Sequence, residues 1–128
     1  MNIKTSSSHR NKEPENNFLY IVATPIGNLD DLSYRALHIL KNVSLIACED
    51  TRQTKKIMSK YSFKNNLLSF NKHTALTKVG RIINDLKSGK SVALVSDAGM
   101  PGICDPGEEL VKVARKNDIN IICVPGPC

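Results

Sequence analysis

Short apolar runs alternate with longer amphipathic segments along this chain, and that alternation constrains the fold more than any other feature. Such runs predict strands at residues 18–23, 45–48, 66–70, 91–95 and 119–124. Buried strands that alternate with helical segments are typical of β-α-β units around a parallel sheet. We therefore predict an α/β fold with a five-stranded, mainly parallel sheet and helices on both of its faces.

The segments between these runs carry apolar residues at helical spacing, which predicts helices that pack on the sheet. We expect Asn28 or Asp30 to start the first helix, and Ser88-Gly89 to end the helix over residues 74–87. The predicted buried stripes are Leu32, Ala36, Ile39, Leu40 and Val43, then Leu76, Val79, Ile82, Ile83 and Leu86, then Leu110, Val111, Val113 and Ala114.

Loops rich in glycine and proline follow the first, fourth and fifth predicted strands, at residues 24–29, 96–107 and 125–127. The carboxyl ends of parallel strands share one rim, and open α/β sheets bind ligands there. Gly99 permits a positive φ or a close backbone approach, and the Asp97 carboxylate accepts hydrogen bonds from ligand hydroxyl or amine groups. Asp105 and Pro106 also fit a helix N-cap and first helical position, which is an equally good explanation of both.

Charged residues gather after the second predicted strand. Asp50 and Gln53 fit a capping box, whereas Glu49 and Arg52 have no such structural explanation. A basic segment follows, and the net charge of +6 with a pI near 9.3 favours an anionic partner. For any one of its lysines, a solvated helix face is the simpler interpretation. The segment contains Arg52, Lys55, Lys56, Lys60, Lys64 and Lys72.

Several classes of site lack their motifs. There is no Gly-x-Gly-x-x-Gly after the first strand and no Gly-x-x-x-x-Gly-Lys-Ser/Thr loop, which argues against nicotinamide and nucleoside-triphosphate chemistry. The cysteines have no Cys-x-x-Cys spacing and the histidines are scattered, so we expect reduced, packed thiols and no metal site. The cysteines are Cys48, Cys104, Cys123 and Cys128.

The first seventeen residues are polar and lack the apolar core of a signal peptide. They predict a disordered lead over residues 1–17, followed by one domain over residues 18–128. No apolar stretch is long enough to span a bilayer, so we expect a cytoplasmic protein without a membrane partner.

Five motifs follow one another from Phe18 onward: ATPIGNL at 23–29, CEDTR at 48–52, VALVSDAGMP at 92–101, DPG at 105–107 and PGPC at 125–128. In this order they resemble the tetrapyrrole methylase superfamily, and most closely its ribosomal RNA branch. The resemblance implies a class III methyltransferase fold and S-adenosylmethionine as methyl donor. It also implies 2′-O-methylation of a cytidine ribose in the decoding region of 16S rRNA, with 16S rRNA or the small ribosomal subunit as partner and a homodimer in complete members.

The resemblance assigns roles to particular residues. Glu49, Asp50 and Arg52 would face the reaction or the RNA, where a carboxylate could act as general base or Arg52 could hold a phosphate. Arg52, with Lys55, Lys56 and Lys60, is a candidate for RNA binding. The residues assigned to the cofactor are Thr24, Pro25, Ile26, Gly27, Asn28, Asp97, Ala98, Gly99, Met100, Pro101, Pro125 and Gly126.

This sequence departs from the family pattern at three places. Met100 stands where threonine is usual, which removes a hydroxyl donor from the cofactor loop, and Cys104 stands where serine is common. Family members also continue into a second domain, whereas nothing follows Cys128 here, so we expect this chain to supply one wall of the cofactor cleft. Two alternatives stay open: a sibling that methylates a tetrapyrrole carbon or the diphthamide precursor, and a catalytically silent truncated fragment.

Overall fold

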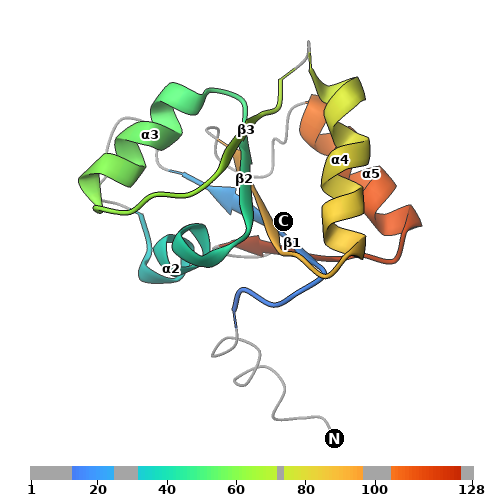
Figure 1. Ribbon diagram of the computed structural model, residues 1–128, viewed down its shortest axis with the longest axis horizontal. Coiled ribbons are helices and arrows are strands. Elements are labelled where there is room, and N and C mark those ends of the chain that lie inside the picture. The colour runs from blue at the N-terminus through green and yellow to red at the C-terminus, as the bar shows by residue number, and fades with distance from the viewer. Residues whose placement is uncertain (1–12, 25–31, 72–73, 97–104, 125–128) are drawn as a thin grey trace, which may run out of the picture.

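The computed structural model describes residues 13–24, 32–71, 74–96 and 105–124, which form a five-stranded sheet flanked by helices (Figure 1). The strands are β1 (Phe18–Ala23), β2 (Leu45–Cys48), β3 (Leu67–Ser69), β4 (Val92–Ser96) and β5 (Asn120–Val124). The helices are α2 (Tyr34–Asn42), α3 (Thr51–Lys60), α4 (Ala75–Lys87) and α5 (Asp105–Lys116). The strand order is β3-β2-β4-β1-β5, and every neighbouring pair is parallel. The predicted fold class is confirmed.

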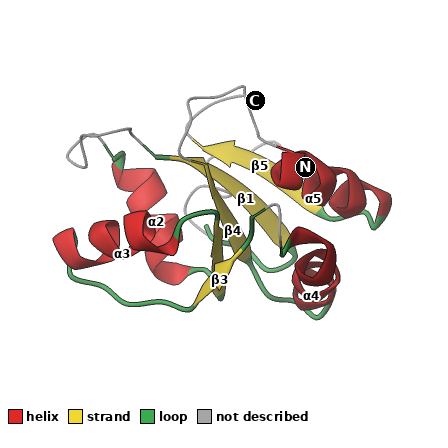
Figure 2. Cartoon of the chain, turned by 90° about the horizontal axis from the view of Figure 1, so that it is seen from above, coloured by secondary structure: helices red, strands yellow, loops and turns green. Residues whose placement is uncertain are grey.

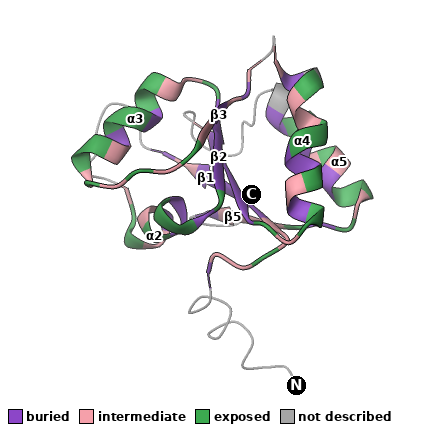
Figure 3. Cartoon of the chain, viewed as in Figure 1, coloured by how far each residue is buried: buried purple, intermediate pink, exposed green. Residues whose placement is uncertain are grey.

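Both faces of the sheet are buried, which explains why the strands read as continuous apolar runs (Figure 3). Along β1, Leu19 and Ile21 belong to the core cluster that contains residues of α4 and α5. Tyr20 and Val22 belong to the opposite cluster, which contains residues of α2 and α3. The view from above shows the same division, with α2 and α3 on one side of the sheet and α4 and α5 on the other (Figure 2).

Local capping fixes where the helices begin and end. Ser33 is the N-cap of α2, and its hydroxyl accepts a hydrogen bond from the Ala36 amide at 3.1 Å. The predicted start of this helix at Asn28 or Asp30 is wrong, because Ser33 is the cap and α2 begins at Tyr34. After α4, Gly89 adopts a φ of +97°, and its amide donates to the Leu86 carbonyl at 3.1 Å, as the sequence predicts for a helix end at Ser88-Gly89.

Residues 13–17 pack against the domain. Glu13 is buried, and its two carboxylate oxygens accept hydrogen bonds from the Arg35 guanidinium at 2.9 and 2.8 Å. The Glu15 amide donates to the Tyr20 hydroxyl at 2.9 Å, and burial raises the pKa of Tyr20 to about 12, so this acceptor stays a neutral phenol at physiological pH. These contacts differ from the predicted disordered lead over residues 1–17, whose first twelve residues lie outside the described part of the chain.

Cysteine chemistry also departs in part from the prediction. Cys48 is a buried thiol at the end of β2, as expected. Cys123 in β5 is disulfide-bonded, so the prediction of reduced cysteines is wrong for this residue; its partner lies outside the described ranges. Cysteine spacing gives a pairing signal only for local motifs, and a bond set by tertiary proximity has no such signature.

None of the helices within the described ranges has the length and apolar content needed to cross a bilayer.

Two glycines of the α4 region should respond oppositely to alanine. A Cβ at Gly80 meets nothing within 4 Å, so Gly80→Ala should stabilise the fold by about 0.5–1 kcal/mol through helix propensity. Gly89→Ala should destabilise it by about 1 kcal/mol, because alanine disfavours the positive φ there. Urea unfolding of both variants checks this, and a stabilised Gly89→Ala would contradict the described helix end.

Candidate functional site

The described strands create a topological switch point between β1 and β4. The chain leaves β1 for α2 on one face of the sheet, and leaves β4 for α5 on the opposite face (Figure 2). Because β1 and β4 are neighbours in the sheet, their connections diverge above the same rim. In open parallel sheets this divergence creates the crevice where ligands bind.

The ends of β1 and β4 are fastened to each other at this point. The register pairs Ala23 with Ser96, and the next amide, that of Thr24, donates to the Ser96 carbonyl at 2.9 Å. The Thr24 hydroxyl donates to the same carbonyl at 3.2 Å. Thr24 is buried, so its side chain holds the floor of the switch point and leaves only acceptor capacity at Oγ1 for a ligand.

Two further strands end at the same level. The register pairs Val22 of β1 with Val124 of β5, and Val95 of β4 with Cys48 of β2. With strands about 4.8 Å apart, the four ends span roughly 14 Å of rim. The strands that precede the three glycine- and proline-rich loops therefore end at one rim, as the sequence predicts, and they are also neighbours in the sheet. Apart from Thr24, the residues predicted to bind the cofactor lie outside the described ranges: Pro25, Ile26, Gly27, Asn28, Asp97, Ala98, Gly99, Met100, Pro101, Pro125 and Gly126.

The predicted catalytic residues lie where β2 passes into α3. Asp50 is the N-cap of α3, and its Oδ1 accepts from the Arg52 amide at 2.9 Å and from Arg52 Nε at 3.3 Å. The side-chain hydrogen bond from Arg52, followed by the bond from its amide, lowers the pKa of the Asp50 carboxyl. Glu49 is exposed beside them. The helix-cap interpretation of Asp50 is thus confirmed, and Glu49 is the more accessible carboxylate.

The cationic residues of α3 form an exposed surface next to the rim. Arg52, Lys55, Lys56 and Lys60 are all exposed, and Lys60 Nζ lies 5.8 Å from the centre of the Tyr61 ring. The structure adds two apolar residues, Met58 and Phe63, that line a pocket at the edge of this surface. Neither residue was predicted from the sequence, although an aromatic residue inside a basic segment indicates nucleic-acid contact.

Comparison with known proteins agrees with this architecture. Residues 18–128 match the family model described as Tetrapyrrole (Corrin/Porphyrin) Methylases. Among solved structures, the uroporphyrin-III-C-methyltransferase of Thermus thermophilus superposes with a TM-score of 0.65 at 22% identity, over 85% of this chain and 47% of that one. A diphthine synthase superposes with a TM-score of 0.65 at 15% identity, over 85% of this chain and 44% of that one. At these identities the superpositions show the fold alone.

Sequence relatives are more similar. The ribosomal RNA small subunit methyltransferase I of Halalkalibacterium halodurans is 48% identical over 97% of this chain and 43% of its own length. Proteins of that name from Buchnera aphidicola subsp. Schizaphis graminum and Thermotoga maritima are 53% and 50% identical, over 86% and 85% of this chain. These two are covered over 39% and 49% of their lengths, so the chain spans less than half of each of these relatives.

Proposed function

Because the chain belongs to the tetrapyrrole (corrin/porphyrin) methylase family, we propose that it takes part in S-adenosylmethionine-dependent methylation of RNA in the small ribosomal subunit. The observation that carries this proposal is the switch point between β1 and β4, from which the motif-bearing loops depart. The names of the 46–53% identical relatives support RNA as the substrate. The 2′-hydroxyl of a cytidine in 16S rRNA is the acceptor that we propose.

The rim between β1 and β4 fits a nucleoside cofactor in its position, at the carboxyl ends of parallel strands. S-adenosylmethionine supplies a methyl group on a sulfonium, which an in-line displacement transfers to the acceptor. The residues that would hold it are Thr24 to Asn28, Asp97 to Pro101, and Pro125 with Gly126. These residues would align the methyl donor with its acceptor and exclude water, because correct placement of the reactants accounts for much of the rate enhancement. Thr24 contributes by joining the end of β1 to the end of β4 through the Ser96 carbonyl.

Removal of the ribose hydroxyl proton requires a base, and the α3 start offers two carboxylates. Asp50 is occupied by the helix cap and by Arg52, and its lowered pKa makes it the weaker base. Glu49 is exposed and adjacent to the rim, so we assign it the base. The side chain of Arg52 is 86% exposed, which leaves it accessible to an RNA phosphate.

The roles of the two carboxylates should be distinguished by the methyl-transfer rates of two matched variants of the full-length protein. Glu49→Gln should lower methyl transfer by about a hundredfold or more, as expected for loss of a general base. Asp50→Asn should keep most activity, because asparagine also caps helices. The reverse ranking in initial rates would transfer the base to Asp50.

Acid unfolding gives Asp50 an independent signature. A carboxyl with a lowered folded pKa stabilises the fold above its unfolded pKa, and that contribution is lost as pH falls through the folded pKa. Asp50→Asn should therefore flatten the acid side of the stability profile.

The proposal is tested by methyl transfer from S-adenosylmethionine labelled in its methyl group. Small ribosomal subunits that lack the modification should accept label on a cytidine 2′-oxygen, which nuclease digestion and mass spectrometry locate. Label on a porphyrinogen, or on the diphthamide precursor, would contradict an RNA substrate and assign the chain the substrate of another family member. Absence of transfer to any of them would favour the silent-fragment alternative.

A further inference from the structure

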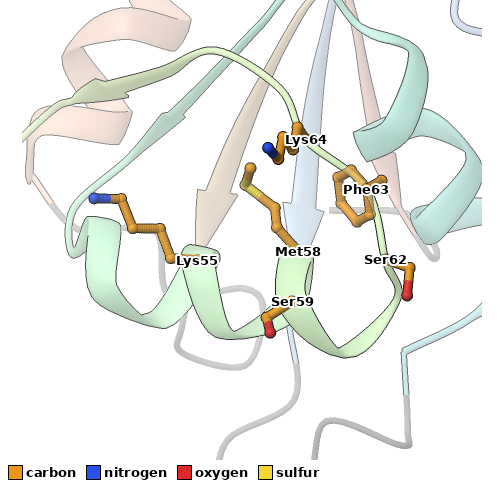
Figure 4. A pocket seen from close by; sticks show the side chains of 6 residues that line it. All are labelled: Lys55, Met58, Ser59, Ser62, Phe63 and Lys64. Atoms are coloured by element: carbon orange, nitrogen blue, oxygen red, sulfur yellow. The ribbon is translucent and has the colours of Figure 1, made fainter.

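A groove of about 650 Å³ runs between α3 and the segment that follows it (Figure 4). Its volume lies in the range of sites that hold small organic ligands. Met58 and Phe63 supply apolar surface and are both half-buried, while Lys55 and Lys64 are exposed. The hydroxyl-bearing Ser59 and Ser62 complete the lining.

The charge around this groove has one sign. Residues 51–66 contain five cationic side chains and no carboxylate. Among the described residues, Lys55 and Lys64 have no ion-pair partner. An aromatic ring flanked by uncompensated cations is the combination with which proteins bind unpaired nucleotides, since the base stacks and the phosphates meet the cations.

We propose that this groove binds one unpaired nucleotide of the RNA substrate, with its base against Phe63 and Met58 and its flanking phosphates at Lys55 and Lys64. The inference rests on the proposed function for the identity of the RNA. The groove is a second binding site, outside the cofactor rim, that recognises unpaired RNA. A base held in a duplex has no exposed face to stack, so the groove selects unpaired RNA.

The position of the groove relative to the rim supports this role. Helix α3 begins at the rim after β2 and runs away from it, so Lys55 lies about 6 Å along the helix axis from Thr51. The segment after α3 turns back onto the helix, where the Phe63 amide donates to the Met58 carbonyl at 3.0 Å, and Met58 lies about 10 Å along the helix axis from Thr51. The groove would therefore hold a neighbour of the modified nucleotide rather than the nucleotide itself.

The experiment compares Phe63→Leu with Phe18→Leu in the full-length protein. Both phenylalanines are half-buried against the same core cluster, but only Phe63 lines the groove. The probe is a short single-stranded RNA that carries 2-aminopurine, whose fluorescence falls on stacking. Phe63→Leu should lower affinity about tenfold and abolish the quenching, because leucine keeps apolar volume but offers no ring. Phe18→Leu should change neither, and equal melting temperatures verify equal folding.

The second part of the experiment compares two charge-reversal variants. Lys64→Glu should weaken binding and reduce the slope of log K against log salt by about 0.7, whereas Lys112→Glu on α5 should not. Equal affinities of the Phe63 and Phe18 variants, absence of RNA binding by the wild type, or equal affinity for a fully paired RNA duplex would each overturn the inference. Binding is measured without S-adenosylmethionine, so a protein that binds as expected yet transfers no methyl group would refute the proposed function and leave the groove assignment standing.

Discussion

Gly99→Val is expected to abolish detectable binding of S-adenosylmethionine while the domain stays folded. Gly99 comes three residues after the end of β4 at Ser96, in the loop that departs from the switch point. A glycine at this position permits a left-handed backbone or a close approach of a ligand to the backbone, and a branched side chain opposes both, the first by roughly 1–3 kcal/mol.

The matched control is Gly80→Val on the exposed surface of α4, where an added Cβ meets nothing within 4 Å. Titration calorimetry should give the wild-type dissociation constant for Gly80→Val and no measurable heat for Gly99→Val. Wild-type affinity in Gly99→Val would remove this loop from the cofactor site.

Ile21→Ala is expected to destabilise the fold strongly. Ile21 is fully buried in the central strand pair, opposite Leu94 of β4 and Cys123 of β5. Truncation of a buried isoleucine costs about 2–5 kcal/mol, a large part of the roughly 5–15 kcal/mol that stabilises a typical domain. The melting temperature should fall by about 10 °C or more.

Two controls accompany this variant. Ile21→Val should cost only about 1 kcal/mol, because it removes a single methylene group. Tyr34→Ala, at a residue that is 83% exposed, should change stability by less than about 0.5 kcal/mol. Similar melting curves for Ile21→Ala and Tyr34→Ala would contradict the described core.

Strand identity and the faces of the sheet could be predicted from sequence because both are local properties. Successive residues such as Tyr20 and Ile21, which face opposite sides of a strand, are apolar, and this predicts a strand buried on both sides. The order of strands could not be predicted, because the insertion of β4 between β1 and β2 depends on which face each connecting helix covers. The switch point follows from that order. The sequence therefore predicted that the loops share one rim, but not that the switch point lies between β1 and β4.

Contacts between distant residues explain the other differences. The burial of Glu13 depends on Arg35, which is 22 residues away, and a polar lead gives no local sign of such a partner. The groove beside α3 combines Met58 and Phe63 across a helix end, so its shape depends on how the chain turns at Tyr61 and Ser62. By contrast, the Asp50 cap was predictable because donor and acceptor are two residues apart.

The proposed cofactor site lies at the carboxyl ends of β1, β4 and β5. Backbone amide chemical shifts recorded during titration with S-adenosylmethionine test this directly. We predict the largest changes at Thr24, Ser96 and Val124, with little change at Asn17, Ser91 and Asn120 at the opposite ends of the same strands. Saturable changes confined to that opposite edge, or no changes at millimolar cofactor, would contradict the proposed site.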